Sequence, residues 1–149
     1  MVAFMDIAPA TPGHVLVVPR AHEPSLIDLD AEDGARMFQV AQQLAGALRR
    51  SAIPAEGINL LMADGEVALQ DVFHAHLHVV PRTDGDGFTL SADFGDPSRD
   101  LLDAQAADIR SVLNPPGYSG RERSAEFQDG VPSLSSRRAG DAHTRQAGT

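Results

Sequence analysis

Short apolar segments separated by turn-forming residues fill the first half of the chain. The segment Val2 to Ile7 is mostly apolar, and the six residues after it include two prolines and a glycine, which is typical of a loop. His14 to Val18, with the sequence HVLVV, is β-branched and apolar, and Ile58 to Met62 has a similar character. Each of these three segments has the length and composition of a β-strand.

A fourth segment, Val72 to Val80, alternates apolar residues with histidine and contains the sequence FHAHLHVV. Strict alternation predicts a strand with one face in the core and the other face exposed to a cleft. Pro81 follows directly, and a proline cannot donate to a strand ladder. The pattern therefore predicts a strand that ends at Val80.

Two segments show helical periodicity. In the first, Asp28 and Asp30 offer N-caps, and apolar residues then fall on one helical face: Met37, Val40, Ala41, Leu44 and Leu48. The second begins near Asp96-Pro97 and carries Leu102, Ala106, Ile109 and Leu113 on one face.

The predicted order is strand, strand, helix, strand, strand, helix. Separated helices and tight Asp-Gly turns indicate an α+β fold with an antiparallel sheet, one long helix and a C-terminal helix. After residue 113 the sequence becomes rich in Ser, Gly, Arg and Pro. We therefore predict one domain over residues 1–113 and a disordered tail over residues 114–149.

Composition narrows the function classes. A chain of 149 residues suits one domain, and its formal net charge of −9 disfavours nucleic acid as a partner. The sequence has no cysteine, which excludes disulfides and thiolate metal sites within it. It also has no apolar stretch long enough to span a membrane and no recognisable signal peptide, so a cytoplasmic protein without membrane partners is expected.

The three histidines His74, His76 and His78 are the main candidates for chemistry. In a strand, alternate residues share a face, so these side chains would lie in a row, about 6.5–7 Å apart. The residues between them, Ala75, Leu77 and Val79, would then face the core. A row of imidazoles is a poor structural filler, because each ring has two nitrogens that need partners.

Three interpretations of this row are open. It can be an ordinary half-buried strand face. It can be a zinc site, joined by His14 or His22, although such sites usually have carboxylates that orient the ligands. It can also be a nucleophilic centre, because a neutral imidazole can attack phosphorus while its neighbours hold the tautomer and move a proton.

The row and a second block resemble the histidine triad (HIT) family of nucleotide hydrolases and transferases. Residues 74–80, HAHLHVV, match the family's His-φ-His-φ-His-φ-φ signature, where φ is apolar. Phe4 to Ile7 and Pro12 to His22 resemble an upstream block of the family in order and spacing. The resemblance covers residues 1 to about 113, all but the predicted tail.

The resemblance implies catalytic roles for four histidines. His76 is similar to the nucleophile that attacks the α-phosphorus of a nucleotide, and His78 to the residue that contacts the phosphate. His74 is similar to the residue that orients the nucleophile through hydrogen bonds. His14 resembles a supporting histidine behind the triad. The alternative is that His14 has only a structural role, as a hydrogen-bonded core residue at the start of a strand.

The resemblance also implies substrate contacts and a reaction. Asp6 resembles the acid that holds the ribose hydroxyls, Ile7 the apolar contact for the base, and Gln70 a residue on the phosphate and leaving-group side. Asp6 can equally cap a turn, and Gln70 can be an ordinary polar loop residue. The implied reaction forms a nucleotidyl-histidine that water hydrolyses, on a nucleoside phosphoramidate or a dinucleoside polyphosphate. It needs no metal or cofactor, and such proteins usually form homodimers.

The sequence departs from the family pattern in three places. The family has an N-terminal helix and strand before the block that begins here at Val2. We expect that these elements are missing from this sequence because the start codon is assigned too late. Ala63 stands where an Asn usually contacts the nucleotide, and Asp71 where a small hydroxyl residue usually touches the phosphate. A carboxylate there would repel an anionic substrate. A catalytically weakened nucleotide-binding or interaction protein is therefore the alternative function.

Overall fold

The computed structural model describes residues 1–113. The chain divides into two compact units, Met1–Ser91 and a second that begins at Ala92. Each unit is described by itself. Among the described residues, no helix is long and apolar enough to cross a membrane.

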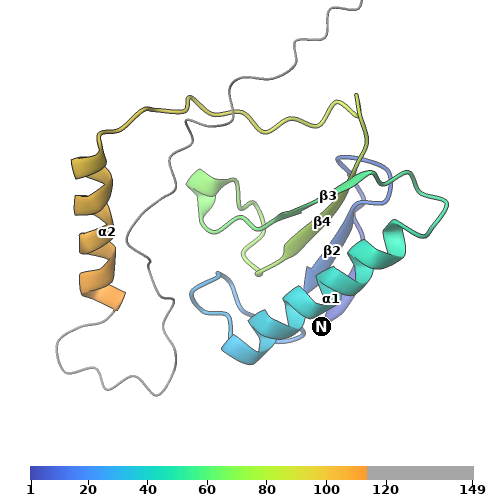
Figure 1. The fold of residues 1–149 in the computed structure, drawn as a ribbon. Helices are drawn as coiled ribbons and strands as arrows, with labels where there is room; N and C mark the ends of the chain where they lie inside the picture. The colour runs from blue at the N-terminus through green and yellow to red at the C-terminus, as the bar shows by residue number, and fades with distance from the viewer. Residues whose placement is uncertain (114–149) are drawn as a thin grey trace, which may run out of the picture. The chain divides into compact units, whose positions relative to one another are not determined.

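The first unit is built on a four-stranded antiparallel sheet (Figure 1). The strands are β1 (Val2–Met5), β2 (Val15–Val18), β3 (Gly57–Leu61) and β4 (Leu77–Arg82). Their order across the sheet is β1-β2-β4-β3, so β4 lies between β2 and β3. The antiparallel sheet and the helices confirm the α+β prediction.

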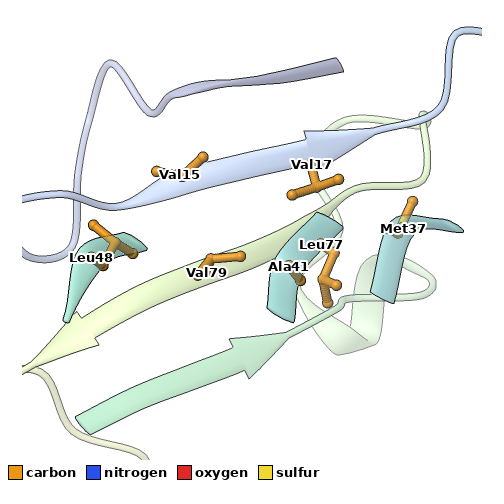
Figure 2. Packing of buried hydrophobic residues seen from close by; sticks show 7 residues of the cluster. All are labelled: Val15, Val17, Met37, Ala41, Leu48, Leu77 and Val79. Carbon is orange, nitrogen blue, oxygen red and sulfur yellow. The ribbon is translucent and has the colours of Figure 1, made fainter. Parts of the chain in front are cut away.

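Helix α1 (Ala31–Leu48) covers one face of this sheet (Figure 1). The Asp30 side chain accepts a hydrogen bond from the backbone N–H of Glu32, which confirms one of the two predicted N-caps. The predicted apolar face is the one that packs against the strands. Figure 2 shows the resulting core, formed by Met37, Ala41 and Leu48 of α1 with Val15, Val17, Leu77 and Val79 of the sheet.

The histidine face is the face of the sheet opposite α1. Leu77 and Val79 point to the core, so His78, which lies between them, points to the other side. His78 is paired with Leu16 of β2 and with Leu61 of β3, and residues paired across antiparallel strands share a face. The core therefore fixes the direction in which His78 points.

The fourth predicted strand, Val72 to Val80, is wrong at its start. His74 and His76 precede β4, because the backbone there bonds to loops instead of a strand ladder: the N–H of Ala75 donates to the carbonyl of Glu23 (2.6 Å), and the N–H of His74 to the carbonyl of Val72 (2.8 Å). The predicted row of three histidines on one strand is therefore a bend followed by a strand.

The predicted end at Val80 is also wrong, because β4 includes Pro81 and Arg82. The carbonyl of Pro81 accepts a hydrogen bond from the Thr11 hydroxyl at 2.6 Å, on the β2 side of β4. In an antiparallel strand the nitrogen of a residue points to the same side as its carbonyl. The β2–β4 ladder ends at the pair Val15 and Val79, so β2 has no residue that would accept a hydrogen bond from position 81. A proline, which has no N–H, is therefore tolerated there.

The second unit contains helix α2 (Arg99–Leu113). It begins after Ser98, whose hydroxyl accepts from the N–H of Leu101 at 3.3 Å, so the predicted start at Asp96-Pro97 is slightly early. None of its residues is buried; Leu102 and Ala106 are half-buried, whereas Ile109 and Leu113 are exposed. The disorder predicted for residues 114–149 lies outside the described residues.

Candidate functional site

His76 has one ring nitrogen bonded to the backbone. Its Nδ1 lies 2.7 Å from the carbonyl oxygen of His74. A carbonyl only accepts hydrogen bonds, so Nδ1 carries the proton of the neutral ring. The other nitrogen, Nε2, then holds a lone pair, and the half-buried ring is in the tautomer that a nucleophile needs.

His78 belongs to a chain of hydrogen bonds with a defined direction. The N–H of Ala10 donates to Nδ1 of His14 (3.2 Å), so the proton of neutral His14 lies on Nε2. His14 Nε2 in turn donates to Nδ1 of His78 (2.9 Å). The Nε2 of His78 therefore carries a proton that can be donated to an anion. The ring centroids of His78 and His76 are 4.8 Å apart.

Burial keeps this pair of histidines neutral near pH 7. His14 is 4% exposed, and burial lowers its pKa, against an opposing effect of the Asp6 carboxylate 3.4 Å from its Nδ1. Burial also lowers the pKa of His78, and positive charge on His76 or His14 would lower it further. When His14 and His78 are both neutral, the hydrogen bonds from Ala10 to His14 and from His14 to His78 keep the directions described above.

This arrangement predicts a pH dependence of stability. The folded-state pKa values of His14 and His78 lie below the ordinary value of 6.5, so below that pH the unfolded chain binds more protons than the native protein. We expect the contribution of the pair to the free energy of unfolding to be complete above about pH 6.5 and to be lost as pH falls through the folded-state pKa values.

The measurement is NMR titration of the histidine Cε1–H signals, together with urea unfolding at pH 7.5 and 5.5. The His78 signal should titrate at lower pH in the native protein than in denaturant. The variant His78→Gln should lose part of the stability difference between the two pH values. A native midpoint at or above the denaturant midpoint would contradict the prediction.

The His74 ring points to different partners. Its Nε2 lies 3.1 Å from the Pro19 carbonyl, to which it donates, and its ring centroid is 5.5 Å from that of His22. The group of His74 that contacts His76 is therefore the backbone carbonyl. The predicted orienting role of the His74 ring stays a prediction.

Two hollows adjoin the histidines. The smaller, of about 250 Å³, is apolar apart from the histidines, and is lined by Phe4, Leu16, Val18, Val72, His74 and His76. The larger, of about 560 Å³, has both polar and apolar walls, and its lining includes Asp6, His14, Leu61, Ala63, His78 and Phe88. The histidines thus stand at two adjoining openings in one surface of the first unit.

The predicted substrate residues are placed differently from one another. Asp6 lines the larger hollow, and its Oδ1 accepts from the N–H of Ala8 (2.8 Å), so it also caps a turn. Ile7 is fully exposed and does not line either hollow. Asp6 is thus positioned to contact a ligand in the larger hollow, whereas Ile7, which was predicted to contact the base, lies outside both hollows.

Gln70 is buried and bonded to backbone groups. Its amide nitrogen donates to the carbonyls of Pro24 (2.7 Å) and Val72 (3.2 Å), and its amide oxygen accepts from the N–H of Gly65 (2.8 Å). It is 2% exposed. These bonds join the loop before the histidines to the segment after β2, and the substrate contact predicted for Gln70 stays a prediction.

Ala63 and Asp71, the two residues that depart from the family pattern, also differ in position. Ala63 lines the larger hollow, so a nucleotide there would meet a methyl group at that point. Asp71 is exposed, and its predicted repulsion of an anion depends on how closely a ligand approaches it.

The structure adds wall residues that sequence reasoning missed. Phe4 and Leu16 are paired across β1 and β2 and line the smaller hollow; Phe88 lines the larger one. The register between strands decides which apolar side chains border the histidines. The signal available in the sequence was the alternation within each strand, which does not give this register.

Within residues 1–113, one group of side chains could hold a metal ion. Asp6, His14 and His78 offer ligand atoms that all lie within 4.8 Å of one another. This group shares His14 and His78 with the zinc interpretation of the sequence, but contains the carboxylate of Asp6 in place of His74 and His76. His14 Nε2 and His78 Nδ1 are hydrogen-bonded to each other, so a metal that used both of these nitrogens would have to break that hydrogen bond.

Comparisons with known proteins identify the family of the chain. The HIT domain model matches residues 1–85. An uncharacterized HIT-like protein of Borreliella burgdorferi is 44% identical over 90 residues, 59% of this chain and 64% of that protein. The chain matches 61–64% of the length of this and the next curated relatives, less than two thirds.

Solved structures show the same fold. A zinc-bound histidine triad family protein from Mycobacterium smegmatis is 42% identical, with a TM-score of 0.57 over 74% of this chain and 80% of that one. A histidine triad nucleotide-binding protein from Candida albicans is 27% identical, with a TM-score of 0.67 over 74% and 80% of the two chains. The chain therefore belongs to the HIT domain family.

Proposed function

We propose that this protein hydrolyses or transfers nucleotides by forming a covalent bond between the α-phosphorus and Nε2 of His76. The observation that supports this most is the hydrogen bond from His76 Nδ1 to the His74 carbonyl, which leaves a lone pair on Nε2. A weak nucleophile is activated when its tautomer and orientation are already fixed.

The proposed reaction has two displacements. In the first, His76 Nε2 forms a bond to the α-phosphorus, and the bond from phosphorus to the amine or phosphate leaving group breaks. The leaving group departs with its electron pair and takes a proton from water, while the Nε2–H of neutral His78 donates a hydrogen bond to a phosphoryl oxygen. In the second, water attacks phosphorus and loses a proton to the solvent, the bond from phosphorus to His76 Nε2 breaks, and the monophosphate and neutral His76 are released.

The larger hollow is our proposed site for the nucleoside. Its volume of about 560 Å³ falls within the usual range of small-molecule pockets, and Asp6 in its wall can accept hydrogen bonds from ribose hydroxyls. The name of the Candida albicans protein, which describes nucleotide binding, supports a nucleotide as the ligand. We propose nucleoside phosphoramidates or dinucleoside polyphosphates as substrates, and a cytoplasmic homodimer as the working form.

The test is AMP release from adenosine 5′-phosphoramidate, followed by chromatography, with and without a chelator. We expect turnover that the chelator leaves unchanged, because histidine nucleophiles need no metal. Turnover that disappears with the chelator and returns with zinc would contradict the proposal and would favour metal-assisted hydrolysis at Asp6, His14 and His78.

A second candidate is a nucleotide-binding protein with little activity. It is favoured by Ala63, because its methyl group lines the larger hollow where family members usually present an amide. Calorimetric binding of AMP without any release from the phosphoramidate would support this candidate against the enzyme.

A further inference from the structure

Arg82 lies on the histidine face of the sheet. It follows His78 by four positions in β4, and residues two and four apart in a strand point to the same side. It is paired with Gly57 of β3, whose lack of a side chain leaves room beside it. The Arg82 side chain is therefore directed to the same surface as the proposed site.

The Arg82 guanidinium closes the turn that follows β4. It donates to both carboxylate oxygens of Asp86, at 2.7 and 2.9 Å, and to the carbonyl of Phe88 at 2.6 Å. Asp86 in turn accepts from the backbone N–H groups of Thr83 and Phe88, each at 3.0 Å. Paired, charge-assisted bonds of this kind give a fixed geometry, and here they fix a turn.

Phe88 connects this turn to the larger hollow. The guanidinium carbon of Arg82 lies 4.6 Å from the centroid of the Phe88 ring, over one of its faces. Phe88 and the next two residues, Thr89 and Leu90, are part of the wall of the hollow that contains His78. The turn fixed by Arg82 and Asp86 therefore leads directly into these three wall residues, and it contacts Phe88 through both its backbone and its ring.

We propose that Arg82 and Asp86 are positioning residues that hold Phe88 as a wall of the nucleoside site, and that this clamp sets the affinity for the nucleoside part of the substrate. The inference rests on the proposed function, because it takes the larger hollow to be the nucleoside site. It assigns a role in recognition to a turn that does not touch the reacting atoms.

The clamp should act on binding more than on chemistry. Phe88 is a wall residue, whereas the proposed displacement takes place at His76 and His78. An interaction made equally in the ground state and the transition state changes KM and leaves kcat unchanged. Loss of the wall should therefore raise KM for the phosphoramidate and the dissociation constant of AMP by similar factors.

The experiment compares Asp86→Asn and Phe88→Ala with Asp103→Asn. Asp103 is a matched control, because it forms the same i,i+4 pair with an arginine, Arg99, on exposed α2. We expect KM and the AMP dissociation constant to rise about tenfold in the first two variants, with kcat within about twofold, and no change in the control. Phe88→Tyr, which keeps the ring, should restore the wild-type KM.

The outcomes separate the clamp from a general loss of folding. A variant that is partly unfolded loses active molecules, so kcat per total protein falls while KM stays the same, and that result would overturn the inference. Unchanged KM and AMP affinity in Asp86→Asn and Phe88→Ala would also overturn the inference. In that case, turnover by the wild type would still support the proposed function. A wild type that neither turns over the phosphoramidate nor binds AMP would refute both.

Discussion

His76→Ala should abolish AMP release from adenosine 5′-phosphoramidate, with a fall in kcat of about 10⁴–10⁶-fold, the order expected when a covalent nucleophile is removed. The His76 ring donates from Nδ1 to a backbone carbonyl, so its lone pair is on Nε2. His74 also donates to a backbone carbonyl, that of Pro19, but from Nε2, so its lone pair is on Nδ1, and His14 and His78 are bonded to each other. The described residues therefore offer no substitute nucleophile at that position.

The control for this variant is His22→Ala. His22 is also a histidine close to the triad, with its ring centroid 5.5 Å from that of His74, but it is exposed. We expect its turnover to stay within about threefold of wild type, since surface substitutions usually have small effects. Covalent capture should agree: acid-quenched wild type should carry labelled AMP, and His76→Ala should carry none. Labelled AMP on the variant would refute His76 as the nucleophile.

Gln70→Ala should produce the largest loss of stability among the predicted substitutions. Three backbone groups, on Pro24, Gly65 and Val72, lose their partner in a region where Gln70 is 2% exposed. Buried polar groups left without partners cost about 1–3 kcal/mol each, and some will find water. We expect the free energy of unfolding to fall by about 2–4 kcal/mol in urea denaturation.

Gln39→Ala is the matched control, because Gln39 is an exposed glutamine of α1 that accepts from Arg36. Its free energy of unfolding should change by less than about 0.5 kcal/mol. The pair also separates two roles of Gln70. A stability loss supports the loop contacts, whereas unchanged stability with a raised KM would favour the substrate contact that the family resemblance implies.

Local patterns determined the elements of this fold. The helical spacing of Met37, Ala41 and Leu48 and the cap at Asp30 are properties of neighbouring residues, and both predictions were confirmed. The alternation of Ala75, Leu77 and Val79 with histidine likewise predicted which residues are buried. These features depend on helix and strand periodicity, which a single segment carries by itself.

The strand boundaries and the identity of each histidine's partner depend on other segments. Residues 72–76 have the alternation of a strand, yet the carbonyl of Glu23 takes the N–H of Ala75 out of the ladder. Pro81 was predicted to end the strand, yet β4 includes it, because β2 does not extend alongside the nitrogen of Pro81. Such effects come from segments distant in the sequence, so no local pattern could have predicted them.

The sequence alone therefore determined the fold class, the set of candidate histidines and their resemblance to the HIT family. The tertiary structure decided the chemistry available to each one. It gave His76 a backbone acceptor, made His14 the donor to His78, and bonded Gln70 to the loop. A tautomer is set by the partner of each ring nitrogen, and that partner is known only when distant parts of the chain are brought together.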